Sequence, residues 1–185
     1  MGLTSALYSF WHTYGSDIQN GAVVLSAVAA FAVIRDSRRT ARRRGTLDLI
    51  LHQQSDAELV KSRGEFNKIK AGTERPSSYG KAGQEASVQF ETIRKVLNIH
   101  ELTAVAINEG VIDELVYRRW FNSTLINDRE AMKDFMVEVR KTHNAPAAFC
   151  EFDKLAKRWR DDPNWNDSPG WFARKRQAAI KLFHA

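Results

Sequence analysis

The residues best suited to chemistry lie on one predicted helix, over residues 84–109. His100 and Glu101 begin the sequence HELTA, which matches the start of a helical zinc motif. That motif needs a second histidine four residues after the first, but position 104 is alanine, so this metal site cannot form. The other histidines are scattered along the chain. We therefore predict no metal site, no cofactor and no catalytic residues.

Three polar residues, Asn98, Glu101 and Asn108, share one face of the same predicted helix, beside an apolar stripe. They fit a solvated face, a contact surface for a partner, or a buried polar cluster that fixes how helices pack. We favour the buried cluster, because Asn98 directly follows Leu97 on the apolar stripe. A carboxylate in a pocket would instead suit an enzyme or a toxin, with Glu101 as its main residue.

The remaining reactive or bulky side chains are predicted to be structural. Cys150 is the single cysteine, so no internal disulfide exists, and its apolar neighbours predict a core thiol rather than a nucleophile. Trp120 and Trp159 are predicted in the core. Trp165 and Trp171 flank a turn and could form an exposed aromatic patch.

The N-terminal part of the chain is strongly apolar. Residues 18–34 read IQNGAVVLSAVAAFAVI and carry no charge. As a helix they extend about 26 Å, close to the ~30 Å of a bilayer hydrocarbon core. We predict a single transmembrane helix over residues 16–34, after an interfacial segment over residues 1–15. The alternative is a buried helix of a soluble domain.

A basic run directly follows the apolar one. Residues 35–44 contain one aspartate and six arginines, which are Arg35, Arg38, Arg39, Arg42, Arg43 and Arg44. Arginines beside a span stay in the cytoplasm and contact anionic headgroups, so we predict an inner-membrane protein with its N-terminus outside. Nucleic-acid binding by the same arginines is the alternative. We do not favour it, because such surfaces normally spread their charge over a folded face.

Two further features concern the span itself. Ala22, Ser26 and Ala30 are four residues apart, and small residues at this spacing let two helices approach closely. They are candidates for self-association of the span in a homo-oligomer, and the alternative is a chance spacing, which is common in alanine-rich spans. Residues 1–17 contain no lysine or arginine, which predicts an uncleaved anchor rather than a signal peptide.

The rest of the chain has helical periodicity. Residues 35–55 are predicted as a basic juxtamembrane helix or linker, and residues 56–185 as a cytoplasmic helical domain. The helices expected in that domain cover residues 56–70, 84–109, 111–125, 128–143, 146–159 and 171–183. No segment alternates like a strand, so the predicted fold is all-α: one transmembrane helix followed by an irregular cytoplasmic helical bundle.

Part of this domain resembles a known family. The sequences VLNIHELTAVAINEGVID (residues 96–113) and LVYRRW (residues 115–120) are similar to the bacterial and prophage membrane proteins grouped as domain of unknown function 4760. The positions that carry the resemblance are Leu97, Asn98, Glu101, Gly110, Val111, Ile112 and Asp113. The resemblance covers roughly residues 20–160. It implies a span, a basic stretch and a helical domain, and it implies no activity.

These features together predict a membrane-tethered helical interaction module. It would be a non-enzymatic accessory or regulatory protein, of the kind associated with prophages or defence, that binds the anionic bilayer and an unidentified protein partner. Two alternatives stay open. One is a membrane-bound enzyme or toxin using Glu101, and the other is a membrane-tethered nucleic-acid binder using the arginines.

Overall fold

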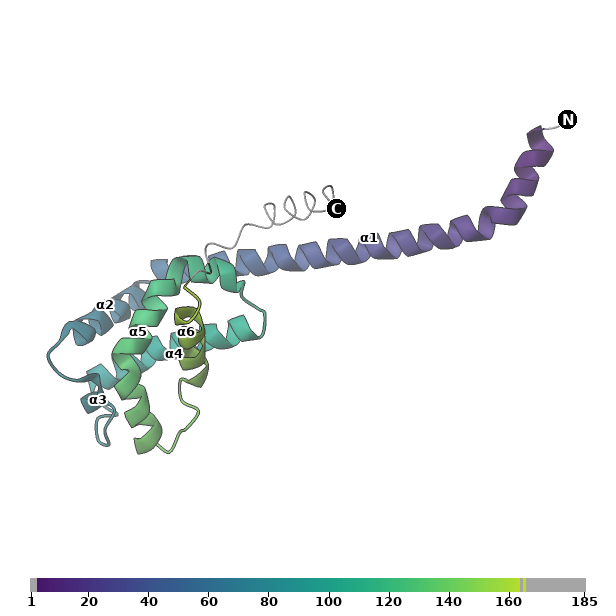
Figure 1. Cartoon of the computed structure of the whole chain (residues 1–185). Helices are drawn as coiled ribbons and strands as arrows, with labels where there is room; N and C mark the ends of the chain where they lie inside the picture. Colours follow the sequence, from purple (N-terminus) through teal and green to yellow (C-terminus); the bar gives the residue numbers. More distant parts are fainter. Residues whose placement is uncertain (1–2, 164, 166–185) are drawn as a thin grey trace.

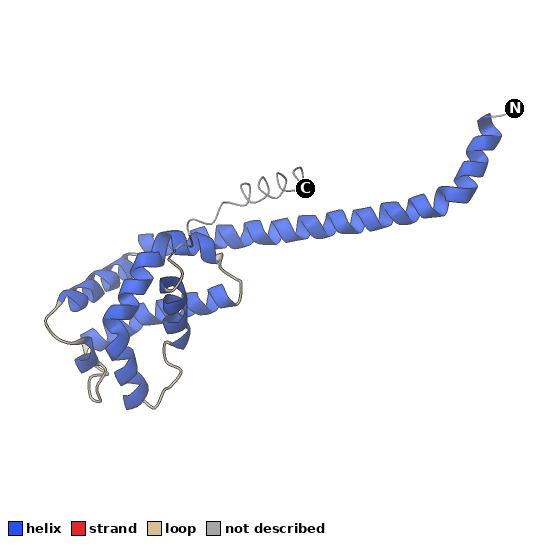
Figure 2. Ribbon diagram, in the orientation of Figure 1, coloured by secondary structure: helices blue, strands red, loops and turns tan. Residues whose placement is uncertain are grey.

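The computed structural model describes residues 3–163 and 165, with side chains described from residue 20 onward. Over these residues the chain is helical and contains no strand (Figure 2). The helices are α1 (Leu3–Ser55), α2 (Ala57–Ala71), α3 (Pro76–Tyr79), α4 (Val88–Asn108), α5 (Glu114–Thr142) and α6 (Cys150–Arg160). The predicted all-α fold is therefore confirmed. The helix predicted over residues 171–183, with Trp171, lies outside the described residues.

Most of α1 extends away from the rest of the protein (Figure 1). It is one continuous helix of 53 residues, with a bend close to its N-terminal end and no break between residues 1–15 and the following segment. Every described side chain from residue 20 to residue 45 is exposed. The apolar run is therefore not a buried helix of a soluble domain. It is long and apolar enough to cross a membrane.

The other helices, together with the last turns of α1, enclose one hydrophobic core. Its largest buried side chains are Trp159, Tyr117, Phe66, Phe135 and Phe152. α4 packs between α2 and α6, whereas α5 contacts α1, α3 and α6. α1 thus ends inside the bundle instead of being joined to it by a flexible linker.

Polar caps set the boundaries of these helices. Asp56, Ser87 and Asp113 each accept a hydrogen bond from the backbone N–H three residues further on, at the starts of α2, α4 and α5. After α4, Gly110 adopts a φ of 69°, a left-handed conformation that favours glycine. The chain can therefore turn sharply from α4 into α5.

Several helix boundaries differ from the sequence prediction, and α4 begins at Val88, after the Ser87 cap, rather than at residue 84. The helices expected over residues 111–125 and 128–143 form the single helix α5, because no glycine or proline interrupts them and Asp128 points into the core instead of capping a helix. α6 begins at Cys150 rather than at residue 146. The reason is Phe149, whose φ of 57° cannot continue a right-handed helix.

The predictions for cysteine and tryptophan are partly correct. Trp159 is buried, as expected, but Trp120 is 62% exposed because it lies on the outer face of α5. Cys150 is half-buried at the start of α6 rather than in the core. Trp165 is also half-buried, and its ring lies 4.8 Å from the Arg118 guanidinium.

Candidate functional site

A basic hollow lies between α1 and the loop that joins α4 to α5. Its volume is about 710 Å³, and we call it the arginine trough. The residues that line it are Arg35, Arg38, Arg39, Arg42, Arg43, Gly110, Asp113 and Leu115. Five of the six predicted membrane-contact arginines therefore meet at one place, and Arg44 does not line it.

Helical geometry explains this division. Arg35, Arg39 and Arg42 are spaced by four and three residues, and the same spacing continues through Thr46 to Ile50. Thr46 and Ile50 are buried against the bundle. The trough arginines consequently stand on the bundle-facing side of α1, just beyond the edge of the bundle.

Hydrogen bonds between α1 and α5 hold the two walls of the trough together. The Thr46 hydroxyl accepts the backbone N–H of Asp113 and donates to the Arg42 carbonyl, both at 2.8 Å. The Asp113 carboxylate pairs with Arg43 at 3.3 Å. Deeper in the bundle, the Tyr117 hydroxyl donates to Gln53 Oε1 at 3.2 Å. The five residues that join the two helices, Arg43, Thr46, Gln53, Asp113 and Tyr117, are called here the α1–α5 latch. It fixes α1 at one angle to the bundle.

Sequence reasoning missed the latch. The motif signal for Asp113 was a helix start, which is correct, but nothing in a single sequence links it to Thr46, 67 residues away. The signal that could have been noticed is a threonine on the same helical face as Ile50, at the point where the basic run ends.

The trough has an excess of positive charge. Among the described residues, Arg43 is the one trough arginine with a carboxylate within 4 Å. Five arginines and one aspartate give the lining a formal charge of +4. Guanidinium groups with free N–H donors bind phosphate and carboxylate groups bidentately, so this lining suits an anion.

The polar residues predicted on α4 do not form a buried cluster. Asn98 and Asn108 are exposed, and Glu101 is half-buried. The Glu101 carboxylate accepts the backbone N–H groups of Glu151 and Phe152, at 3.1 and 2.7 Å. α6 begins against this point of α4, so Glu101 caps α6 and faces the positive end of its dipole. Asn108 donates to the Glu151 carboxylate at 2.8 Å.

The surroundings of Glu101 are relevant to the alternative in which the protein is an enzyme or a toxin that uses this carboxylate. Asn98 and Glu101 do line a hollow of about 520 Å³ between α4, the end of α5 and the segment before α6. Both oxygens of Glu101, however, already accept backbone N–H groups. In this arrangement Glu101 is a structural acceptor.

A buried polar cluster does exist at another place in the bundle. His100 Nε2 lies 3.0 Å from one oxygen of Asp128, and Lys70 donates to the other oxygen at 2.5 Å. The His100 ring is completely buried and stacks on Phe152, with ring centroids 4.9 Å apart. The cluster joins α2, α4 and α5. Sequence reasoning missed it because its members come from three helices.

The charges in this cluster follow from its burial. Desolvation lowers the pKa of His100, and the hydrogen bond to Asp128 offsets this only in part, so the ring is neutral at pH 7. Burial alone would raise the pKa of Asp128. Hydrogen bonds from His100 and Lys70 outweigh it and place that pKa below its usual value. The cluster is thus a Lys70–Asp128 ion pair supported by a neutral histidine.

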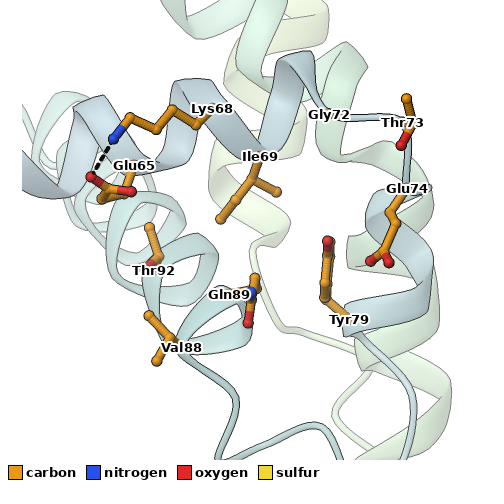
Figure 3. A pocket seen from close by; sticks show the side chains of 10 residues that line it. All are labelled: Glu65, Lys68, Ile69, Gly72, Thr73, Glu74, Tyr79, Val88, Gln89 and Thr92. Atoms are coloured by element: carbon orange, nitrogen blue, oxygen red, sulfur yellow. Dashed lines mark hydrogen bonds and ion pairs between the residues drawn. The ribbon is translucent and has the colours of Figure 1, made fainter.

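A third hollow, of about 380 Å³, lies between α2, α3 and α4 (Figure 3). Ile69 and Tyr79 border it, and at its rim Lys68 pairs with Glu65 at 2.8 Å (Figure 3). Its lining has one lysine and two glutamates, a formal charge of −1, whereas the lining of the arginine trough has a formal charge of +4. Over the described part of the chain, no group of three or more His, Cys, Asp or Glu side chains is close enough to hold a metal ion.

One protein family matches the part of the chain that contains these sites. The model of the family described as "Domain of unknown function (DUF4760)" matches residues 20–159, more than half of the chain. The chain belongs to the DUF4760 family. The match includes the arginine trough, the α1–α5 latch and Glu101, so the basic segment of α1 is part of the DUF4760 unit and not an appendage to it. No curated protein and no solved structure matches the chain.

Proposed function

We propose that this DUF4760 protein is a membrane-tethered helical interaction module of the inner membrane. Its bundle would act as a non-enzymatic accessory or regulatory protein at the cytoplasmic surface. One observation carries the proposal: α1 runs without a break from an exposed apolar segment, through the arginines, into the core of the bundle.

The exposed apolar segment supports the membrane anchor. Val24, Leu25 and Phe31 are more than 60% exposed, and no side chain of the described part of the bundle covers them. A continuous apolar surface of this length is unfavourable in water and favourable in a bilayer. We assign residues 16–34 as the span. The arginines then stay inside the cell, which places the N-terminus outside.

Surface features of the chain support an interaction role. Leu102, Val111 and Trp120 are large apolar side chains of the bundle that remain exposed, as at surfaces that bind other proteins. Within the span, the Ser26 hydroxyl donates to the Ala22 carbonyl at 2.8 Å. This bond satisfies the hydroxyl donor within its own helix, which supports close approach of a second copy along the small-residue stripe.

Reporter fusions test the membrane placement. A phosphatase that is active only outside the cytoplasm, fused after Ala185, should be silent. A fluorescent protein that matures only in the cytoplasm should be bright at the same position. The reverse pattern, or recovery of the full chain in the soluble fraction, would overturn the proposal.

A further inference from the structure

We propose that the arginine trough is a specific binding site for the phosphate groups of an anionic lipid headgroup. This inference rests on the proposed membrane anchor and goes one step further. A diffuse positive collar would attract anionic lipids equally on all sides of α1, whereas a site would bind them on one side only.

The placement of the arginines favours a site. Five of them line one hollow that is closed on its other side by Gly110, Asp113 and Leu115, and Arg44 lies on the opposite face of α1. The latch holds the two walls at a fixed separation. The backbone positions of the arginines are therefore set before a ligand binds, so that binding has to order the exposed side chains only.

The chemistry of the lining matches a phosphate-bearing headgroup. The one carboxylate in the trough, on Asp113, is paired with Arg43. This leaves Arg35, Arg38, Arg39 and Arg42 for an anion, and guanidinium groups bind phosphate oxygens bidentately. Leu115 is partly exposed at the edge of the hollow and offers an apolar contact for the glycerol region.

The depth of the trough favours a lipid over a soluble anion. Arg35 directly follows the span, and Arg43 lies about 12 Å further along the helix. The headgroup layer of one leaflet is about 5–8 Å thick. The trough therefore starts among the headgroups, so a lipid phosphate reaches it without leaving the bilayer. Basic pockets at this level are typical sites for headgroups with two phosphates or a phosphomonoester.

Lipid retention by the purified full chain tests the site. The chain would be extracted in a neutral detergent and titrated with cardiolipin, and bound lipid would be counted by native mass spectrometry. We expect Arg39→Gln to weaken cardiolipin binding about tenfold or more, equal to about 1.4 kcal/mol. The matched control is Arg44→Gln, which removes the same charge from the same run but outside the trough. It should bind like the parent, whereas equal losses in the two variants would show a diffuse collar and overturn the site.

Two further arms identify the source of the phosphate. Inorganic pyrophosphate and a short DNA duplex, each added to the chain in phosphatidylcholine nanodiscs, should show no binding that depends on Arg39. If either one binds as tightly as cardiolipin and loses affinity in Arg39→Gln, the lipid assignment is wrong.

The same variants separate this inference from the proposed function. Arg39→Gln and Arg44→Gln should both stay in the membrane with the bundle in the cytoplasm, as measured by the reporter fusions. If both variants are correctly inserted and bind cardiolipin equally well, the trough is not a specific lipid site. The proposed membrane placement would still stand. A parent chain that does not insert would overturn the proposed function as well.

Discussion

The Glu101 side chain of α4 caps the start of α6. Its carboxylate accepts two backbone N–H groups that would otherwise have no acceptor at the start of that helix. We expect Glu101→Ala to lower the free energy of unfolding by about 1–2 kcal/mol. Glu101→Gln should cost less, because the amide keeps one acceptor oxygen. Denaturant unfolding of the full chain in detergent measures both.

Asn98→Ala is the control for this prediction. Asn98 is exposed on the same helix, so its variant should unfold like the parent. A Glu101→Ala protein as stable as the parent would mean that the cap contributes nothing.

The His100–Asp128–Lys70 cluster makes stability depend on pH. The pKa of His100 is lower in the folded protein than in the unfolded chain, so below about pH 6.5 the unfolded chain binds one proton more than the folded protein does. Stability is therefore full above that pH and falls on acidification, by up to about 1.4 kcal/mol per pH unit. Asp128, whose pKa is also lowered, adds a further loss at more acidic pH.

Unfolding of the full chain at pH 7 and pH 5.5 tests this dependence. His100→Gln should flatten it, because the variant removes the buried group that the unfolded chain protonates first. An unchanged pH dependence in His100→Gln would assign the effect to other groups.

At the residue scale, the sequence pointed to Glu101 as an important side chain, but it did not identify the groups that this side chain contacts. Glu101 was singled out because a carboxylate beside an apolar stripe needs an explanation, and the structure supplies one. Its partners are backbone groups 50 and 51 residues away, which no local pattern specifies. His100 was considered only for metal binding, because its actual partner, Asp128, lies on a different helix.

At the scale of helices, the contact between α1 and α5 decides how the bundle is held. Thr46→Val keeps the shape of the side chain but removes the hydroxyl that accepts the Asp113 N–H. Because that N–H would be left buried without an acceptor, we expect a cost of about 1–3 kcal/mol. Hydrogen exchange should then be faster over residues 46–55 than in the parent.

Thr40→Val is the matched control, since Thr40 is an exposed threonine on the same helix. Its exchange over residues 46–55 should equal that of the parent. If Thr46→Val also exchanged like the parent, the hydroxyl would not be needed for docking α1.

Helix boundaries could be predicted where a local signal marks them. Asp56 and Gly110 carry such signals, a capping side chain and a glycine, and the structure places them at the start of α2 and just after α4. Asp128 was misleading, because an aspartate at that position can either cap a helix or accept hydrogen bonds in the core. Only packing against Lys70 and His100 decides between the two.

At the scale of the whole molecule, the proposed orientation in the membrane rests on charge. Residues 1–34 contain one charged side chain, Asp17 at the start of the proposed span, whereas the flank after the span contains six arginines. Replacing all six arginines by glutamine removes this asymmetry, so we expect a mixed orientation in the reporter fusions. A fully retained orientation would require another role for the arginines.

The central claim is that the bundle is held rigidly at the membrane surface, because α1 is continuous and latched to α5. The direct test is the distance between spin labels in nanodiscs. The labels would be placed by Ser37→Cys on α1 and Ser123→Cys on α5, both exposed positions, in a Cys150→Ser background. We predict a single narrow distance distribution. A broad distribution would show a flexible tether between membrane and bundle, and would contradict the account.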